Sequence, residues 1–187
     1  TYTPNEGMIT DTSINNLLSL KYKIQSLEWV HSVVTLLDIP LLNNSEAPLQ
    51  ERLENFKTLK DDDVNKERGF KEITASPVFR NFVISEDGKT SGIIVYLKKN
   101  KPLDNIKNKS KEEIEIYKDQ IKKQNHKNII EIRDVIKSYE NIGKIHLGGI
   151  PMIADDMMTF IKSDIVVFGL GVLLFIIVTL WYIFRKL

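Results

Sequence analysis

A run of twenty residues without a charged side chain, Ile165 to Phe184, constrains the fold of this chain more than any other feature. At a rise of about 1.5 Å per residue, a helix of this length covers the roughly 30 Å of hydrocarbon in a bilayer. The Thr179 hydroxyl can bond a carbonyl one turn back, so it need not stay unpaired in lipid. We therefore expect residues 165–184 to form a transmembrane helix, with the lipid bilayer as its first partner.

The ends of this run favour one orientation. Trp181 and Tyr182 suit the level of the lipid headgroups, and Arg185 and Lys186 follow directly. Because basic residues are enriched on the cytoplasmic side, this end is predicted to face the cytoplasm and residues 1–163 the periplasm. No signal sequence opens the chain, so we expect an upstream segment and a multi-pass protein of the inner membrane.

Composition narrows the choice of partners for the remaining residues. Residues 1–163 carry 24 basic and 24 acidic residues, a balance that removes the electrostatic case for binding nucleic acid. The chain has no cysteine, so the domain must rest on an ordinary apolar core without disulfides. A domain of about 150 residues is large enough to bury such a core.

The beginning of the chain predicts a strand, a helix and a second strand. Tyr2 lies between two threonines, as at the end of a strand, and Asp11 is a suitable N-cap for a helix. Apolar residues then recur on one helical face, at Ile14, Leu17, Ile24 and Leu27. The β-branched stretch Val30 to Leu37 is typical of a strand, and Asp38 and Pro40 end it.

Residues 41–76 interrupt this pattern and are predicted to form a helical insertion. A polar helix is expected over residues 62–73, after a short amphipathic helix indicated by Leu49, Leu53, Phe56 and Leu59. The run of acids at Asp61, Asp62 and Asp63 is interpreted as a solvated helix start, because a calcium loop spreads its ligands over about twelve residues.

The next segment predicts a β-hairpin. Two strand-like stretches, Asn81 to Ser85 and Thr90 to Leu97, flank Asp87-Gly88, which accepts the positive φ angles of a type I′ turn. Apolar residues occupy both faces of the second stretch, so we expect a central strand covered on both sides.

A long helix and a last strand follow. Ser110 and Glu113 form a capping box, and an apolar stripe continues through Ile114, Tyr117, Ile121, Ile129, Ile132, Ile136 and Tyr139. Gly143 is expected to end this helix, and residues 144–147 to form a strand. Pro151 suits the first turn of the next helix, which we expect to run unbroken to residue 184.

The order of these elements indicates an α+β fold. Residues 1–149 are predicted to form a split β-α-β domain of ferredoxin-like type with a helical insertion. The domain is followed by a membrane-proximal helix over 150–164, the transmembrane helix over 165–184 and a cytoplasmic end over 185–187.

Few residues have a pattern typical of catalysis. Asp155 and Asp156 are adjacent, so they point about 100° apart on a helix and form no dyad; helix-start electrostatics accounts for them better. Asp164 lies at the lipid boundary, where an acid needs water or a partner, and we expect a structural salt bridge. No metal-ligand spacing relates the histidines, His31, His126 and His146. We predict no enzyme, no cofactor and no metal.

One side of the membrane-proximal helix is apolar, and it consists of Ile153, Met157, Phe160 and Ile161. Packing against the sheet or a neighbouring helix is one interpretation of this side. An entry surface for hydrophobic or lipid-like ligands is the other, since flexible Met side chains adapt to varied ligands.

Three segments together resemble a known family. They are Val30 to Leu37 with its Asp-Ile-Pro ending, the stretch Asn81 to Tyr96, and His146-Leu147-Gly148-Gly149-Ile150-Pro151 leading through Asp164 into the apolar run. In this order they resemble the first periplasmic loop and second transmembrane helix of resistance-nodulation-division (RND) permeases. The most similar branch is that of the hydrophobe exporters related to the MMPL and Patched groups.

The resemblance implies a proton-driven exporter of hydrophobic substrates, in which this porter domain moves against a second porter domain and the remaining transmembrane helices. By analogy Gly148, Gly149, Pro151 and Asp164 match the junction that couples the domain to the membrane. The family's proton-relay acids lie in another helix, so none is assigned here. A different class also fits the sequence: an extracytoplasmic ligand-sensing domain of a membrane-anchored signalling protein.

Overall fold

Two antiparallel pairs of strands form the centre of the domain. β1 (Tyr2–Pro4) pairs with β4 (Gly143–Ile145), and β2 (Val30–Thr35) pairs with β3 (Ile93–Leu97). Tyr2 and Ser91 also exchange two backbone hydrogen bonds, each with an N···O distance of 2.8 Å. Since Ser91 lies two residues before β3, this bridge joins the two pairs. The computed structural model describes residues 1–43, 48, 50–51, 55–99 and 109–185.

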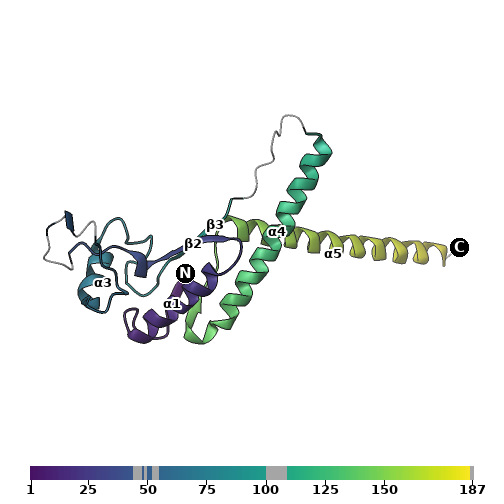
Figure 1. The fold of residues 1–187 in the computed structure, drawn as a ribbon. Coiled ribbons are helices and arrows are strands. Elements are labelled where there is room, and N and C mark those ends of the chain that lie inside the picture. The colour runs from purple at the N-terminus through teal and green to yellow at the C-terminus, as the bar shows by residue number, and fades with distance from the viewer. Residues whose placement is uncertain (44–47, 49, 52–54, 100–108, 186–187) are drawn as a thin grey trace.

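The domain combines helices with these antiparallel strands, so the described residues are of the α+β class. The helices are α1 (Asp11–Gln25), α3 (Lys66–Ala75), α4 (Lys111–Ser138) and α5 (Ile150–Phe184), with short 3₁₀ turns η1 (Leu36–Asp38) and η3 (Glu140–Ile142). Figure 1 shows α3 at the end of the domain away from α5, while α4 lies beside α1 and crosses the start of α5. α5 then leaves the domain altogether.

The core has two parts, one at each end of α1. One part lies between α1, β2, β3 and α4, and its buried members are Leu20, Ile24, Leu27, Val30, Val33, Ile132 and Val135. The other part lies under the insertion and includes Tyr2, Leu17, Leu36, Leu59, Ile73 and Ile84. The apolar periodicity of the first helix is thus confirmed. Its N-cap is Thr10, whose hydroxyl accepts a hydrogen bond from Ser13 N at 3.2 Å, and not the predicted Asp11.

The predicted hairpin forms only next to its turn. There, Ile84 and Ser91 form an antiparallel bridge and Gly92 N donates to Val83 O at 2.8 Å, whereas β3 pairs with β2. The turn closes through Ser85 N donating to Thr90 O at 2.9 Å, with a positive φ at Gly88 but not at Asp87, so it is not type I′. The reason lies upstream, because the amides of Phe82 and Val83 both donate to Phe79 O and curl this stretch into turns.

β3 is also less covered than predicted. Ile93 and Val95 pack against the core between α1 and α4, whereas Tyr96 and Leu97 are exposed. The strand is therefore only partly covered near its beginning and exposed at its end.

The insertion is confirmed in part. α3 matches the predicted polar helix, but Asn65 caps it by accepting from Arg68 N at 2.8 Å. Asp61 instead accepts the amide of Thr58 at 2.6 Å, and Asp63 pairs with Lys57. The earlier helix falls largely on Leu49 and Leu53, outside the described residues, and it does not reach Phe56 or Leu59, which lie in irregular structure.

The predicted long helix is confirmed, including its capping box, in which Ser110 N donates to Glu113 and Glu113 N donates to Ser110. It ends at Ser138 rather than near Gly143, which begins β4. Gly143 has a φ of +153°, and a Cβ there would lie 2.4 Å from the Thr3 carbonyl oxygen. Close pairing of β1 and β4 explains this glycine.

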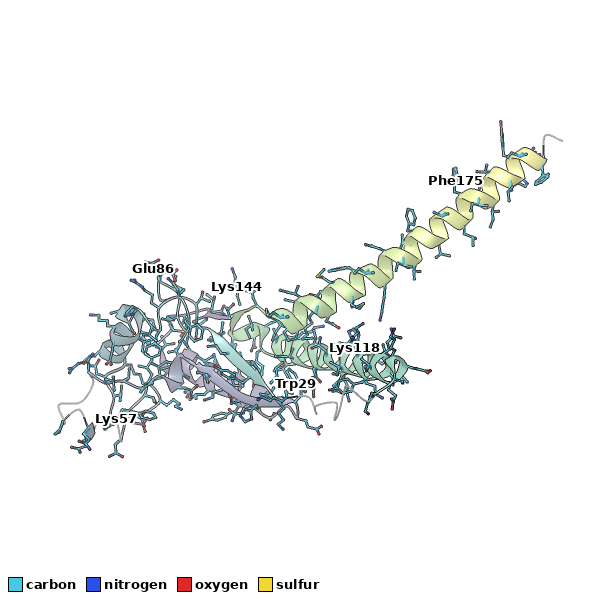
Figure 2. The ribbon with its side chains drawn as sticks, turned by 90° about the horizontal axis from the view of Figure 1, so that it is seen from above. Trp29, Lys57, Glu86, Lys118, Lys144 and Phe175 are labelled. Carbon is cyan, nitrogen blue, oxygen red and sulfur yellow. The ribbon has the colours of Figure 1, made fainter. Side chains whose placement is uncertain are left out.

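α5 is one unbroken helix of 35 residues with Pro151 in its first turn, as predicted. Among the described residues it is the helix long and apolar enough to cross a membrane, and none of its most apolar window is buried. Figure 2 shows the side chains of its far half, Phe175 among them, pointing outward with no other element beside them.

Candidate coupling site between the domain and the apolar helix

The connection between β4 and α5 is short and conformationally demanding. β4 ends at Ile145, and α5 begins at Ile150. Gly149 has a φ of +123°, which L side chains rarely adopt, and its carbonyl accepts the first helical hydrogen bond from Ile153 N at 3.0 Å. Pro151 lacks an amide hydrogen, which the first turn of a helix does not need. The chain therefore passes from strand to helix through only four residues, 146–149.

Three side chains of α4 hold the first turns of α5, and we call these contacts the polar clasp. Asn125 Nδ2 donates to the Pro151 carbonyl oxygen at 2.9 Å. His126 Nδ1 lies 2.9 and 3.0 Å from the two carboxylate oxygens of Asp155. The third contact, made by Arg133 Nη2, reaches both oxygens of Asp156 at 2.8 and 2.9 Å.

The members of the polar clasp differ in exposure. Asp155 is 8% exposed, the buried residue of α5, whereas the side chains of His126 and Arg133 are about half exposed. An ionised carboxylate only accepts hydrogen bonds, so Nδ1 of His126 carries the hydrogen in this contact. Charge-assisted hydrogen bonds of this kind are about twice as strong as neutral ones. The clasp therefore ties α5 to α4 most firmly at Asp155.

These contacts correct the interpretation of Asp155 and Asp156. The two acids form no dyad, as expected, but each contacts a different nitrogen-bearing side chain of α4, and neither lies in the first turn of α5, so helix-start electrostatics is not their main role. The sequence analysis also missed Asn125, His126 and Arg133. No local pattern marks them, because the crossing of α4 and α5 is set by the tertiary fold.

The residues predicted from the resemblance are not all brought together. Gly148, Gly149 and Pro151 adjoin one another at the start of α5. Asp164 lies thirteen residues beyond Pro151, about 20 Å along the helix. It is exposed, and none of the ion pairs among the described residues involves it.

The apolar side of the membrane-proximal helix is uncovered. Ile153, Met157, Phe160 and Ile161 are 52, 58, 66 and 50% exposed, so packing against this domain's own sheet or helices does not account for them. Asp155 lies two positions from both Ile153 and Met157, which is about 160° around a helix. The apolar side therefore faces away from Asp155, while Asp156 lies beside it, about 40° around the helix from Phe160.

A hollow of about 480 Å³ lies at the other end of the domain, between the chain after η1 and α3. Its charged residue, Glu72, accepts the amides of Leu42 and Asn43 at 2.6 and 3.1 Å. That carboxylate therefore holds the local backbone together. Among the described residues, no group of three metal-ligating side chains is found here or elsewhere.

Comparison of the chain with protein-family models, with curated proteins and with solved structures gives no match.

Proposed function

We propose that this chain is a periplasmic porter domain with its coupled transmembrane helix, part of a proton-driven RND-type exporter of hydrophobic or lipid-like substrates in the inner membrane. The observation that carries the proposal is the joint between β4 and α5. β4, a short connection that includes the positive φ of Gly149, the polar clasp and one unbroken helix follow each other along the chain.

Mechanical continuity is what an exporter of this kind requires. A rigid helix transmits a rotation of the domain into the membrane, whereas a flexible linker would absorb it. Gly149 holds the entry angle through its positive φ, and Asp155 holds α5 against α4. A movement of the domain is therefore expected to move residues 165–184.

The arrangement of the strands agrees with the ferredoxin-like type that the proposal assumes. With the Tyr2–Ser91 bridge included, neighbouring strands follow the order β4-β1-β3-β2. α1 and α4 contribute to the same part of the core. We propose on this basis that the domain is a split β-α-β unit with an insertion between β2 and β3.

The proposal is tested by stiff substitutions at two neighbouring glycines in the full-length protein. Valine at Gly149 must adopt a strained backbone, which costs about 1–3 kcal/mol, and is expected to change the helix entry angle. Gly148→Val is the matched control, because a Cβ there meets nothing within 4 Å and its φ is not in the positive region.

Efflux of a lipophilic fluorescent dye from intact cells is the measurement. Gly149→Val should reduce efflux strongly at an unchanged amount of protein in the membrane, and Gly148→Val should leave efflux near the original rate. Normal efflux with Gly149→Val would contradict the coupling role. Efflux that does not depend on the protein at all would favour the ligand-sensing alternative.

A further inference from the structure

The spacing of the uncovered apolar side of α5 can be continued into the apolar run, where apolar residues on every side of the helix are exposed. Starting at Ile153, residues spaced alternately by four and three lie on one side of the helix. They are Ile153, Met157, Phe160, Asp164, Val167, Gly171, Leu174 and Val178, which we call the seam. This spacing averages 3.5 residues, the repeat at which two helices wind around each other.

Every large apolar residue of the seam is at least half exposed, and Asp164 is exposed among them. Gly171 sits within the seam, and a Cβ built there meets nothing within 4 Å, so another backbone has room to approach closely. Exposure, open space at Gly171 and an acid that takes part in none of the ion pairs among the described residues thus meet on one line.

Lipid does not reach the beginning of the seam. Ile153 lies twelve residues before Ile165, and Met157 eight, which places them about 18 and 12 Å above the apolar run. The headgroup layer on each side of a bilayer is only about 5–8 Å thick. Ile153 and Met157 therefore need a cover made of protein.

The charge of Asp164 indicates which kind of protein covers the seam. Two copies of this chain share one orientation in a membrane, so pairing through the seam would place Asp164 against Asp164 at the lipid boundary. Like charges there repel, and an acid at that depth requires a partner of opposite charge or water. A basic side chain opposite Asp164 satisfies it.

We propose that the seam of α5 is the docking surface for a second, different α-helix that also continues from the bilayer into water and carries Lys or Arg opposite Asp164. The inference needs α5 to cross a bilayer, but it does not depend on transport. It gives Asp164 a role at a helix interface, separate from the Gly149–Pro151 connection.

The chain has no cysteine, so single cysteines report on the seam directly in the full-length protein in native membranes. Ile153→Cys and Met157→Cys should react with a water-soluble maleimide several-fold more slowly than Thr159→Cys. Thr159 is exposed, at a similar height and away from the seam, and serves as the matched control. Equal rates at all three positions would overturn the proposal.

A photo-reactive benzoylphenylalanine in place of Phe160 identifies the occupant. An adduct with an apolar helical segment that has Lys or Arg within one turn of the linked residue supports the proposal. An adduct with the same segment of a second copy, or with lipid alone, overturns it. The cross-linking yield should fall several-fold with Asp164→Asn and recover with Asp164→Glu. A yield that neither substitution changes would contradict a basic partner opposite Asp164.

Discussion

The domain and the apolar run of α5 treat the same side chains in opposite ways. Leu17 and Leu36 in the domain are 1 and 0% exposed, whereas Leu173 and Leu174 in α5 are 56 and 63% exposed. Burial in the domain removes apolar surface from water, which stabilises the fold by about 25 cal/mol per Å². A helix whose apolar side chains are exposed gains nothing of this kind in water, so an apolar environment suits it. The surrounding medium, and not composition alone, therefore determines whether a leucine side chain is buried or exposed.

Introducing charged residues into each region should produce the largest difference between them. Leu173→Arg combined with Leu174→Arg costs about 6 kcal/mol for insertion, from roughly 3 kcal/mol per arginine at the helix centre. We expect the protein to disappear from carbonate-washed membranes. Val78→Arg combined with Phe82→Arg is the control, because both residues are similarly exposed in the domain, and membrane content should not change. Equal loss from both pairs would contradict the comparison.

Glycines sharpen the comparison next. A Cβ at Gly143 would lie 2.4 Å from the Thr3 oxygen, whereas at Gly169 it meets nothing within 4 Å. Gly143→Ala should destabilise the domain by about 3 kcal/mol or more through strain and loss of the β1–β4 pairing. Gly169→Ala should be neutral. The thermal unfolding midpoint of the detergent-solubilised protein, followed by circular dichroism, separates the two, and equal midpoints would refute the packing at Gly143.

The polar clasp provides a third, smaller contrast within α5. Asp155→Asn weakens a mostly buried, charge-assisted contact and should loosen the first turns of α5 by about 1–2 kcal/mol. Asp156→Asn affects a more exposed pair, for which about 0–1 kcal/mol is expected. Hydrogen exchange of the amides of residues 152–158 measures both. Faster exchange for Asp156→Asn than for Asp155→Asn would reverse the assignment.

Lowering the pH should produce the smallest difference in stability between the two regions. Burial is the largest influence on Asp38 and raises its pKa, but hydrogen bonds from Lys21, Thr35 and Lys60 together bring the pKa below its usual value. A depressed native pKa stabilises the fold above the unfolded-state pKa of about 4, and this contribution is lost as pH falls through the native pKa.

We therefore expect the domain to lose stability below about pH 4 while the apolar run of α5 remains helical. Asp38→Asn should flatten this acid limb in a plot of unfolding midpoint against pH. An unchanged acid limb would mean that Asp38 does not contribute to it.

Local signals in the sequence predicted most of the helices. The capping box at Ser110, the proline in the first turn of α5 and the apolar run each act within a few residues, so their outcome depends little on the rest of the chain. Pairing over long separations was not predictable in this way. Asp87-Gly88 indicated a local hairpin, but β3 pairs with β2, which lies more than fifty residues earlier in the sequence.

The candidate site was predicted in the same uneven manner. Gly149 and Pro151 were found because their backbone requirements are local. His126 and Arg133 were missed because only the crossing of α4 over α5 brings them to Asp155 and Asp156. The apolar side was found by its spacing, but its exposure could be known only once the position of α4 was known.

The most direct test of the account concerns the side of the membrane on which the domain lies. Glu86 is exposed at the end of the domain far from Phe175, as Figure 2 shows, so Glu86→Cys reports the location of the domain in this otherwise cysteine-free chain. In intact right-side-out vesicles, the account predicts that a membrane-impermeant maleimide labels this cysteine without lysis. Labelling only after the vesicles are lysed would contradict it.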